Sequence, residues 1–355
     1  MPITDRDFQL QQLKSLGFCR FYATSPDSAL AVTTDLGTTC GLYCLELEPG
    51  LFYIGQTTNL SHRLKQHARQ GKIFTAFSFL PVKRHHLKIK EKYAIVEAES
   101  KRINLTNRDH SSDPDGSTAL DCILSRDQQL LWLAQQTPFT ISAQEREPSE
   151  ISARQKNNFV KLRRHARWAE IRDIAAGYIA HCIPAPMETE NRRFWCVTCL
   201  PGTTTGDLRR LFCFNINRME TFVLFHSRER NVDLYSLLIV SKSMLTRNYG
   251  SLETFKKAHP HCLCHESTYL AAGNDQLAIE TADFDALSRL FASPFVVRAA
   301  KELNMHLMRK GATVYARHHN WALADALFDA LPMHEPASSV SESRPNDIIQ
   351  GSMTP

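Results

Sequence analysis

The spacing of apolar and polar residues changes several times along this chain of 355 residues. Two short β-compatible runs at residues 42–47 and 51–55 are separated by turn-forming residues at 48–50, which predicts an antiparallel hairpin. Helical spacing follows at residues 60–70 and again at residues 90–104. The front third of the chain therefore predicts a hairpin followed by two helices.

The remainder of the chain changes from helical to strand spacing and back. Residues 119–136 and 150–183 have helical spacing, whereas short runs between residues 194 and 241 predict four strands. A further hairpin is expected over residues 268–280, and residues 283–331 return to helical spacing. The expected fold class is α+β, with a small α/β module that has an antiparallel sheet, a helical middle, and a second α+β domain with antiparallel strands.

Composition and spacing together divide the chain into six segments, which differ in charge, polarity and content of turn residues. They are an N-terminal helical arm at 1–37, a first folded module at 38–110, a linker at 111–118, a helical basic region at 119–185, an α+β domain of unknown role at 190–332, and a polar tail at 333–355 that is expected to be disordered.

Candidate chemistry is concentrated in the first module. The tripeptides Gly41-Leu42-Tyr43 and Tyr53-Ile54-Gly55 each place a tyrosine and a glycine on one face of a strand, because side chains alternate along a strand. Two tyrosines can then share a surface. Arg63 and His67 are four residues apart on the next helix and project from the same side of it. Taken singly, the two tyrosines are also typical of half-buried aromatic residues in a sheet, and Arg63 and His67 are typical of a helix face that is exposed to solvent.

The third element carries two candidate acids, Glu97 and Glu99. Glu97 has Lys101 four residues later, which indicates an ordinary surface ion pair. Glu99 instead lies between Ile95 and Ile103, on the apolar stripe that is expected to face the sheet. A carboxylate on a core face needs a partner, a proton or a metal. Glu99 is therefore the expected functional acid.

In their order along the chain, the two tripeptides, the arginine–histidine pair and Glu99 resemble the pattern of the GIY-YIG nuclease superfamily. The resemblance covers residues 38–110. It implies a small sheet flanked by helices that hydrolyses a phosphodiester with one divalent ion. Family members usually also have an asparagine beyond the glutamate helix. Asn104 and Asn107 both come early for that position, so the sequence leaves open which of them completes the site.

The resemblance also implies a role for each residue. Glu99 would bind Mg²⁺ or Mn²⁺, a hard cation suited to carboxylate, water and phosphate oxygens. Tyr43 would take a proton from the attacking water, which requires a lowered pKa for its phenol, and Tyr53 would position that water or contact the phosphate. Arg63 would stabilise charge on the phosphoryl oxygens, and His67 would carry a proton or hold the phosphate.

The charge distribution is compatible with DNA as a partner. The formal charge of +5 is only mildly basic, so a phosphate-binding surface must come from local clusters. Lys83, Arg84 and Lys88 lie in the connection to the third element and are expected to grip the DNA strand beside the cut. A second basic stretch includes Lys161 and Arg164. It is expected either to contact DNA or to be an amphipathic helix whose cations face water.

The ten cysteines leave two interpretations open. The first residues do not form a secretory signal and no apolar run reaches membrane-spanning length, so a cytoplasmic protein with reduced thiols and no membrane partner is expected. Cys196 and Cys199 form a C-x-x-C pair, and with Cys262 and Cys264 they would supply four ligands to a structural Zn²⁺. The alternative is that they are buried apolar residues on strands.

The sequence therefore predicts a metal-dependent DNA endonuclease whose C-terminal domain selects the target or a protein partner. By analogy, such a protein serves mobile elements, restriction or defence against foreign DNA. The first alternative is a DNA-binding or regulatory protein that keeps the nuclease fold but cuts poorly. The second makes the C-terminal part a protein-interaction module and the nuclease its effector. The chain has no phosphate-cradling glycine loop, so nothing in it suggests use of ATP.

Overall fold

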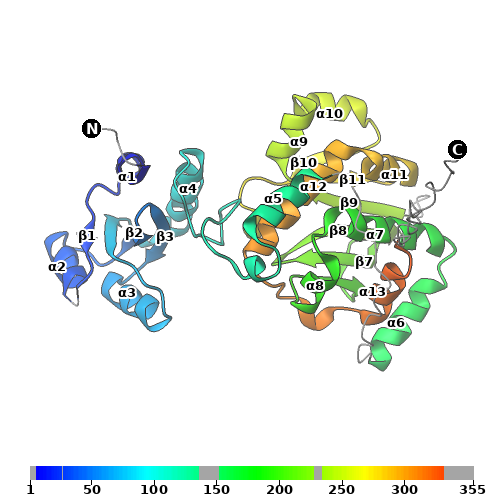
Figure 1. The fold of residues 1–355 in the computed structure, drawn as a ribbon, viewed down its shortest axis with the longest axis horizontal. Coiled ribbons are helices and arrows are strands. Elements are labelled where there is room, and N and C mark those ends of the chain that lie inside the picture. The colour runs from blue at the N-terminus through cyan, green and yellow to red at the C-terminus, as the bar shows by residue number, and fades with distance from the viewer. Residues whose placement is uncertain (1–4, 26, 136–151, 228–233, 332–355) are drawn as a thin grey trace, which may run out of the picture.

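Two antiparallel sheets organise the protein, and each is covered by helices from its own part of the chain (Figure 1). The computed structural model describes residues 5–25, 27–135, 152–227 and 234–331. In these residues the first sheet has four strands and the second has seven. The predicted α+β class is confirmed. Among the described helices, none is both long enough and apolar enough to cross a membrane.

The first sheet has the strand order β1-β4-β2-β3. Its strands are β1 (Tyr22–Ala23), β2 (Gly41–Glu48), β3 (Leu51–Thr57) and β4 (Ala76–Pro81), and its helices are α1 (Asp5–Ser15), α2 (Ser28–Asp35), α3 (Leu60–Arg69) and α4 (Leu87–Ser100), which follows the 3-10 turn η1 (Arg84–His86). The predicted hairpin and the helix at 60–70 are confirmed. Asn59 caps α3, because its side chain accepts a hydrogen bond from the backbone N–H of His62 at 3.0 Å.

The two faces of this sheet have separate cores. Leu42 and Ile54 pack with apolar residues of α1 and α4 on one face, whereas Tyr43 and Phe77 pack with residues of α2 and α3 on the other. The alternation of side chains along β2 and β3 produces this division. Both tyrosines of the two tripeptides consequently lie on the face that α3 covers.

The prediction of a separate N-terminal arm at 1–37 is wrong for the residues that the structure describes. Leu13 of α1 is part of the core on one face of the sheet, and Val32 of α2 is part of the core on the other. Arg6 also forms an ion pair at 2.6 Å with the buried Glu46 of β2. Burial of apolar residues from both helices makes residues 5–35 part of the first domain.

The second sheet has the order β10-β11-β9-β8-β7-β5, with β6 paired to β7. Its strands are β5 (Trp195–Cys199), β6 (Thr204–Thr205), β7 (Leu208–Ile216), β8 (Met219–Ser227), β9 (Leu234–Val240), β10 (Leu263–Glu266) and β11 (Leu277–Thr281). The four strands predicted between 194 and 241 are confirmed. In the hairpin predicted at 268–280 only the second strand is correct, because residues 270–272 form a 3-10 turn and the partner strand β10 lies earlier.

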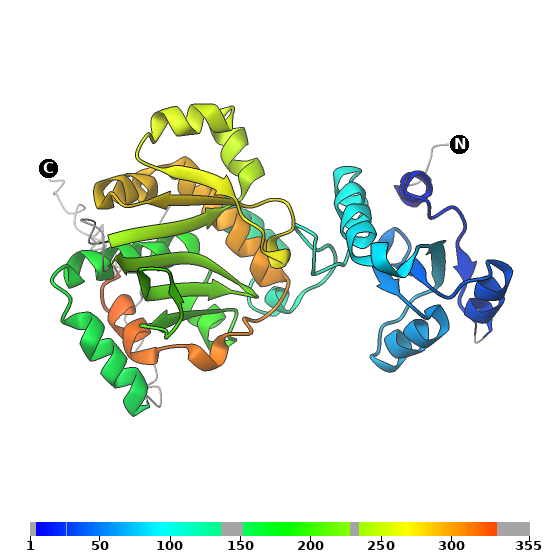
Figure 2. The same cartoon turned by 180° about the vertical axis from the view of Figure 1, so that it is seen from behind.

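Helices surround this sheet (Figure 2). They are α5 (Arg126–Ala134), α6 (Ala153–Arg163), α7 (Trp168–Cys182), α8 (Pro186–Asn191), α9 (Lys242–Tyr249), α10 (Leu252–Ala258), α11 (Phe284–Ala292), α12 (Pro294–Arg309) and α13 (Trp321–Phe328), with 3-10 turns η2 (Ala119–Cys122), η3 (Leu270–Ala272) and η4 (Ala316–His318). One core contains Leu120, Ile171 and Phe214 together. The predicted division between 119–185 and 190–332 is therefore wrong, because both parts fold around the same apolar cluster. The tail predicted at 333–355 lies outside the described residues.

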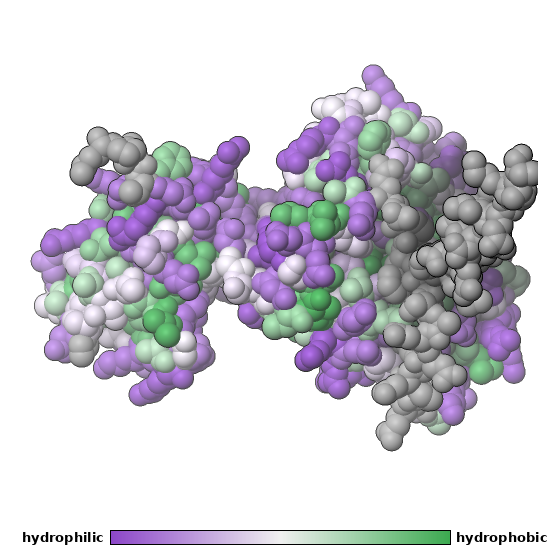
Figure 3. Space-filling model, viewed as in Figure 1, coloured by the Kyte–Doolittle hydropathy of each residue, from purple (hydrophilic) through white to green (hydrophobic). Residues whose placement is uncertain are grey.

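The segment predicted as a linker, residues 111–118, is instead held against the second domain. Arg309, which is almost fully buried, donates hydrogen bonds to the carboxylate of Asp113 at 3.0 Å and to the carbonyl of Pro114 at 2.9 Å. Lys310 donates to the carbonyls of Ser111 and Ala271. Two buried cations thus fix the path of the connector at the narrow waist between the two domains (Figure 3).

Glu99, in the last turn of α4, makes the stability of this junction depend on pH. Its carboxylate accepts a hydrogen bond from the backbone N–H of Ser112 at 2.6 Å. Burial nevertheless raises the pKa of Glu99 from the ordinary 4.5 to about 7, although Ser112 and Lys310 oppose the change. Between these two values the folded protein holds a proton that the unfolded chain has released. The free energy of unfolding contributed by Glu99 therefore falls as pH rises through this window.

We expect Glu99→Gln to remove this dependence. At each pH the free energy of unfolding of the unaltered protein is subtracted from that of the variant. This difference should increase by on the order of 2 kcal/mol when the pH is raised from about 5 to about 7. Urea denaturation at the two pH values measures the change. Glu97→Gln removes a carboxylate from the same helix and is the matched control. The assignment of Glu99 is wrong if the two variants respond to pH equally.

Candidate functional site

Three side chains meet on the face of the first sheet that α3 covers. The phenol oxygen of Tyr43 lies 2.7 Å from Nε2 of His67, and Nε of Arg63 donates a hydrogen bond to the same oxygen at 3.0 Å. Tyr43 and His67 are buried. The spacing of Arg63 and His67 on α3 brings both onto the turns that face β2, as the sequence predicted.

Glycine residues create the space for this arrangement. A Cβ atom at position 55 would overlap the phenol oxygen and ring of Tyr43, which lies directly across the hairpin. A Cβ at position 41 would meet the backbone of Leu80, and it would lie only 2.8 Å from the ring of Phe79. Each tripeptide therefore needs its glycine because a neighbouring aromatic side chain or strand occupies the position of a Cβ atom.

The phenol oxygen of Tyr43 accepts a hydrogen bond from Arg63, because a guanidinium can only donate. The direction of the bond between Tyr43 and His67 is set by the tautomer of His67, and Tyr43 donates when Nε2 carries no hydrogen. His67 is neutral at pH 7, because burial and the charges of Lys72 and Arg63 lower its pKa to about 4. Burial raises the pKa of Tyr43. The protein's own groups therefore do not lower the pKa of Tyr43, and a neutral histidine lies against its phenol.

Tyr53 completes the aromatic group, and Lys72 lies on it. The rings of Tyr43 and Tyr53 are 6.2 Å apart between centroids, and the ring of His67 is 5.5 Å from that of Tyr53. The ammonium nitrogen of Lys72 lies 3.2 Å from the centre of the Tyr53 ring. The sequence interpretation missed Lys72, since it follows the end of α3 and has no helical spacing to connect it with Arg63 and His67.

The charge of Glu91 acts on both Tyr43 and Tyr53, and the sequence interpretation also missed this residue. It lies on α4 and, with Tyr53 and Lys72, lines a groove of about 1240 Å³. Burial raises the pKa of Glu91, whereas an interaction with Gln56 and the charge of Arg63 oppose the change. Its position, four residues before Ile95, is on the same stripe of α4 that led to Glu99.

The expectation that Glu99 belongs to the tyrosine site is corrected by its position. Glu99 lines a different cavity, of about 820 Å³, together with Asp113 and His306. The predicted helix at 90–104 is also displaced, because α4 ends at Ser100 and Arg102 has a φ of +58°. Ile103 is thus beyond the helix, and the apolar spacing that seemed to bracket Glu99 does not continue as a helical stripe.

The choice between the two asparagines is also decided by position. The side chain of Asn107 is buried, and it accepts from the backbone N–H of Ile54 at 2.9 Å and donates to the carbonyl of Ile54 at 2.7 Å. It lines the same groove as Glu91. The side chain of Asn104 instead donates to the carbonyl of Gly50, at the tip of the hairpin. Asn107 is therefore the asparagine that ties the connector to β3 beside the site.

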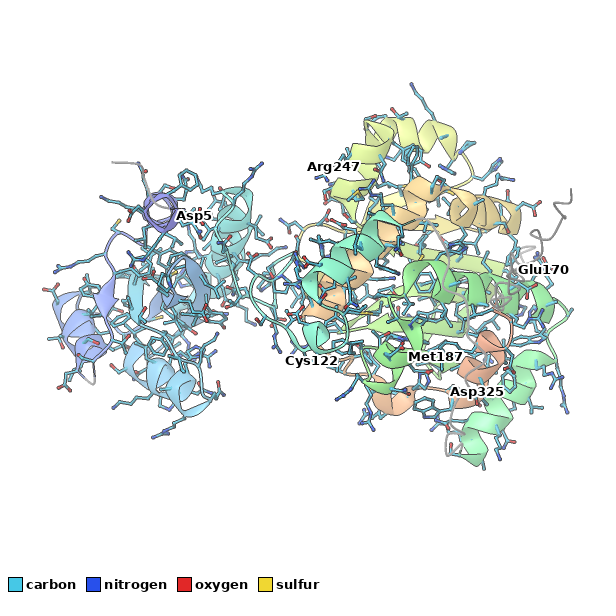
Figure 4. The ribbon with its side chains drawn as sticks, in the orientation of Figure 1. Asp5, Cys122, Glu170, Met187, Arg247 and Asp325 are labelled. Atoms are coloured by element: carbon cyan, nitrogen blue, oxygen red, sulfur yellow. The ribbon has the colours of Figure 1, made fainter. Side chains whose placement is uncertain are left out.

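The two basic clusters occupy different parts of the molecule. Lys83, Arg84 and Lys88 are exposed, and Lys88 lines the groove with Glu91. Lys161 and Arg164 are exposed at the end of α6. That helix, like the labelled Glu170 of α7, lies on the side of the second domain away from the first (Figure 4). Only the first cluster is near the tyrosine group.

The structure does not bring the four candidate zinc ligands together. Cys196 and Cys199 lie on β5, whereas Cys262 and Cys264 lie at or beside β10, and these strands form opposite edges of the second sheet. Four strands separate them, a distance on the order of 20 Å at about 4.8 Å per strand. Cys196 donates to the carbonyl of Tyr315 and is buried. The alternative interpretation, that these are largely buried apolar residues, agrees better with their positions.

Within the described residues, no group of three or more His, Cys, Asp or Glu side chains is arranged to hold a metal ion. A hard divalent ion held by one carboxylate, water and phosphate oxygens does not require such a group. Glu91 fits that mode of binding. It is half-buried, it lines the groove, and no ion pair joins it to a basic side chain in the described part of the chain.

No protein-family model, curated protein or solved structure matches this chain. The chemical interpretation of the groove therefore depends on the contacts described above. They combine a phenol with a neutral acceptor for its proton, a guanidinium, a desolvated carboxylate and an ammonium group.

We expect Gly55→Ala to displace the ring of Tyr43 and break its contact with His67. The overlap should lower the free energy of unfolding by about 1–3 kcal/mol, as overpacking of a closely packed site does. Urea denaturation measures the loss. Gly177→Ala is the control, because nothing lies within 4 Å of an added Cβ in α7. There alanine should stabilise by about 0.5–1 kcal/mol. Equal stability of Gly55→Ala and the unaltered protein would mean that the ring has room to move.

Proposed function

We propose that this protein is a metal-dependent DNA endonuclease of the GIY-YIG type that hydrolyses phosphodiester bonds in the groove beside Tyr43. The observation that carries the proposal is the contact of Tyr43 with both Arg63 and a neutral His67, next to the desolvated carboxylate of Glu91. In this proposal Glu91 replaces Glu99 as the acidic residue of the site. The order of the two tripeptides, Arg63 and His67 along the chain gives independent support.

The proton of the attacking water has a path through two residues. Tyr43 cannot act as a phenolate on its own, because burial raises its pKa. Its oxygen accepts the water proton while its own proton passes to Nε2 of His67. His67 suits this role because it is neutral and in direct contact with the phenol. This path favours the role of His67 as a proton acceptor over the role of a phosphate ligand.

The remaining residues stabilise and place the phosphate. Arg63 keeps its charge, and its guanidinium is held by Tyr43 and by the side-chain oxygen of Gln66 at 2.7 Å. Held in this way, it can stabilise negative charge on the phosphoryl oxygens of the transition state. Glu91 would hold Mg²⁺ or Mn²⁺, which supplies Lewis-acid stabilisation of the phosphate when bound. Tyr53 forms the wall against which the phosphate or the water lies.

For the second domain we propose a role in selecting the DNA target or a protein partner. Arg218, in the turn between β7 and β8, lines the same groove as Glu91, and it pairs with Asp109 of the connector at 3.2 Å. The second domain thus reaches the edge of the groove. The alternative function, a DNA-binding or regulatory protein that cuts poorly, would use the same groove without turnover.

We expect Glu91→Gln to reduce the single-turnover rate of DNA cleavage by at least about a hundredfold, because the amide is a poor ligand for a divalent ion and carries no charge. Glu99→Gln should retain most activity. Cleavage of supercoiled, linear, branched and single-stranded DNA, with Mg²⁺ or with EDTA, provides the assay. The two variants differ by the same chemical change on the same helix, so each is the control for the other.

The outcomes of this comparison are distinct. Loss of activity in Glu99→Gln with full activity in Glu91→Gln would return the acidic role to Glu99. Absence of metal-dependent cleavage by the unaltered protein on all four DNA forms would reject the enzyme and leave the DNA-binding alternative.

The exposed cations beside the groove generate a prediction about binding. We expect Lys83→Ala with Lys88→Ala to weaken DNA affinity for all sequences alike, and to reduce the slope of log affinity against log salt by about 1 for each phosphate that the variant no longer neutralises. Fluorescence anisotropy over a range of salt concentrations measures the slope. Lys256→Ala with Lys257→Ala on α10 removes two exposed charges of the second domain and is the matched control. If the slope of log affinity against log salt is unchanged in the Lys83 and Lys88 double variant, these lysines face solvent and do not contact phosphate.

A further inference from the structure

Lys72 is held in the groove by the turn that ends α3. Gly71 has a φ of +78°, which lets the chain reverse direction immediately after the helix. The backbone N–H of Lys72 then donates to the carbonyl of His67 at 3.0 Å. This reversal brings the side chain back over the sheet, where its ammonium group lies 3.2 Å from the centre of the Tyr53 ring.

Lys72 shares its groove with Arg108 and with the carboxylate of Glu91. No carboxylate forms an ion pair with Lys72 in the described part of the chain, and the nearest charges that act on it are those of Arg63 and Arg108. Lys72 and Arg108 both line the groove. Lys72 and Arg108 in the groove, with the charge of Arg63 acting on Lys72, are suited to an anion such as a phosphodiester, which would compensate their mutual repulsion.

We propose that Lys72 is a further catalytic residue, which donates a proton to the oxygen that leaves phosphorus when the DNA strand is cut. This inference rests on the proposed nuclease function and adds the group that completes the proton balance. Hydrolysis needs a proton acceptor on the attacking side and a proton donor on the leaving side. Tyr43 and His67 form the first, and Lys72 supplies the second.

The reaction then balances. The water oxygen forms a bond to phosphorus, and the water proton enters the Tyr43–His67 pair. The bond between phosphorus and the leaving oxygen breaks with its electron pair on that oxygen. The ammonium group of Lys72 transfers one proton to it, which leaves a terminal hydroxyl group on the DNA and a neutral amine. The Tyr43–His67 pair then releases its extra proton to solvent, and Lys72 takes up a proton from solvent.

Of the three groups that lie against one another here, Lys72, Arg63 and Tyr53, Lys72 is the one suited to this transfer. Arg63 holds its proton too tightly, since its pKa is raised above the already high ordinary value. Burial raises the pKa of Tyr53 and makes its phenol a weaker acid. Burial and the charges of Arg63 and Arg108 lower the pKa of Lys72 to about 8. At neutral pH its ammonium group is therefore charged and readily gives up a proton.

The test uses a leaving group that needs no proton. The ends of the DNA cut by the unaltered protein first identify which bridging oxygen leaves. Sulfur then replaces that oxygen in one substrate, because a thiolate leaves without protonation. All reactions contain Mn²⁺, which tolerates sulfur better than Mg²⁺ does. Single-turnover rates are measured for the unaltered protein, for Lys72→Met and Lys72→Arg, and for Lys65→Met, an exposed lysine of α3 that serves as control.

We expect both Lys72 variants to cut the oxygen substrate on the order of a hundredfold more slowly, and to cut the sulfur substrate at nearly the unaltered rate. Lys72→Arg keeps the positive charge. If this variant cuts the oxygen substrate at the full rate, the proposal is overturned, because Lys72 would then act only through its charge and not as a proton donor. Equal slowing on both substrates would overturn it in favour of phosphate binding. If the unaltered protein cuts neither substrate, the nuclease function itself fails, which is a separate result.

Discussion

The contact between the phenol of Tyr43 and the backbone of Gly55 is the constraint on which the candidate site depends. The two residues lie opposite each other in the β2–β3 hairpin, and the ring occupies the space that a side chain at position 55 would need. This fixes the phenol oxygen where Arg63 and His67 reach it from α3. The missing Cβ atom at position 55 thus leaves the space in which the Tyr43 ring meets the polar groups of α3.

Around this contact, charge and burial act in opposite directions on neighbouring groups. Burial favours the neutral forms of Tyr43 and His67, whereas Arg63 remains charged and donates to the phenol. Lys72 is held nearby without an acidic partner among the described residues. Neutral and charged groups thus lie side by side, because the phenol oxygen of Tyr43 contacts both His67 and Arg63.

The connector between the domains extends this organisation to the second sheet. Arg309 and Lys310 are buried at the end of α12 and direct their donors to the backbone of residues 111–116. Asn107, at the start of the same connector, binds both backbone groups of Ile54 in β3. Buried charges are stable only when their hydrogen-bonding groups are satisfied, so this junction tolerates little displacement. The second domain therefore supports the position of β3 as well as the edge of the groove.

The sequence by itself determined the β2–β3 hairpin, α3 and the faces that they present, because side-chain periodicity is a local property. It did not indicate β1, β4 or α2, which also belong to the first domain. Alternation along the hairpin placed Tyr43 and Tyr53 together, and helical spacing placed Arg63 beside His67. The same reasoning does not distinguish two carboxylates of α4. Glu91 and Glu99 both lie four residues from Ile95, so periodicity gives them the same face and cannot tell which end of α4 crosses the site. Only the tertiary structure separates the two carboxylates: Glu91 lines the groove with Tyr53, whereas Glu99 accepts a hydrogen bond from the backbone of Ser112 and lines the other cavity. Strand order likewise separated Cys196 from Cys262, since it depends on contacts between distant segments that no local pattern encodes.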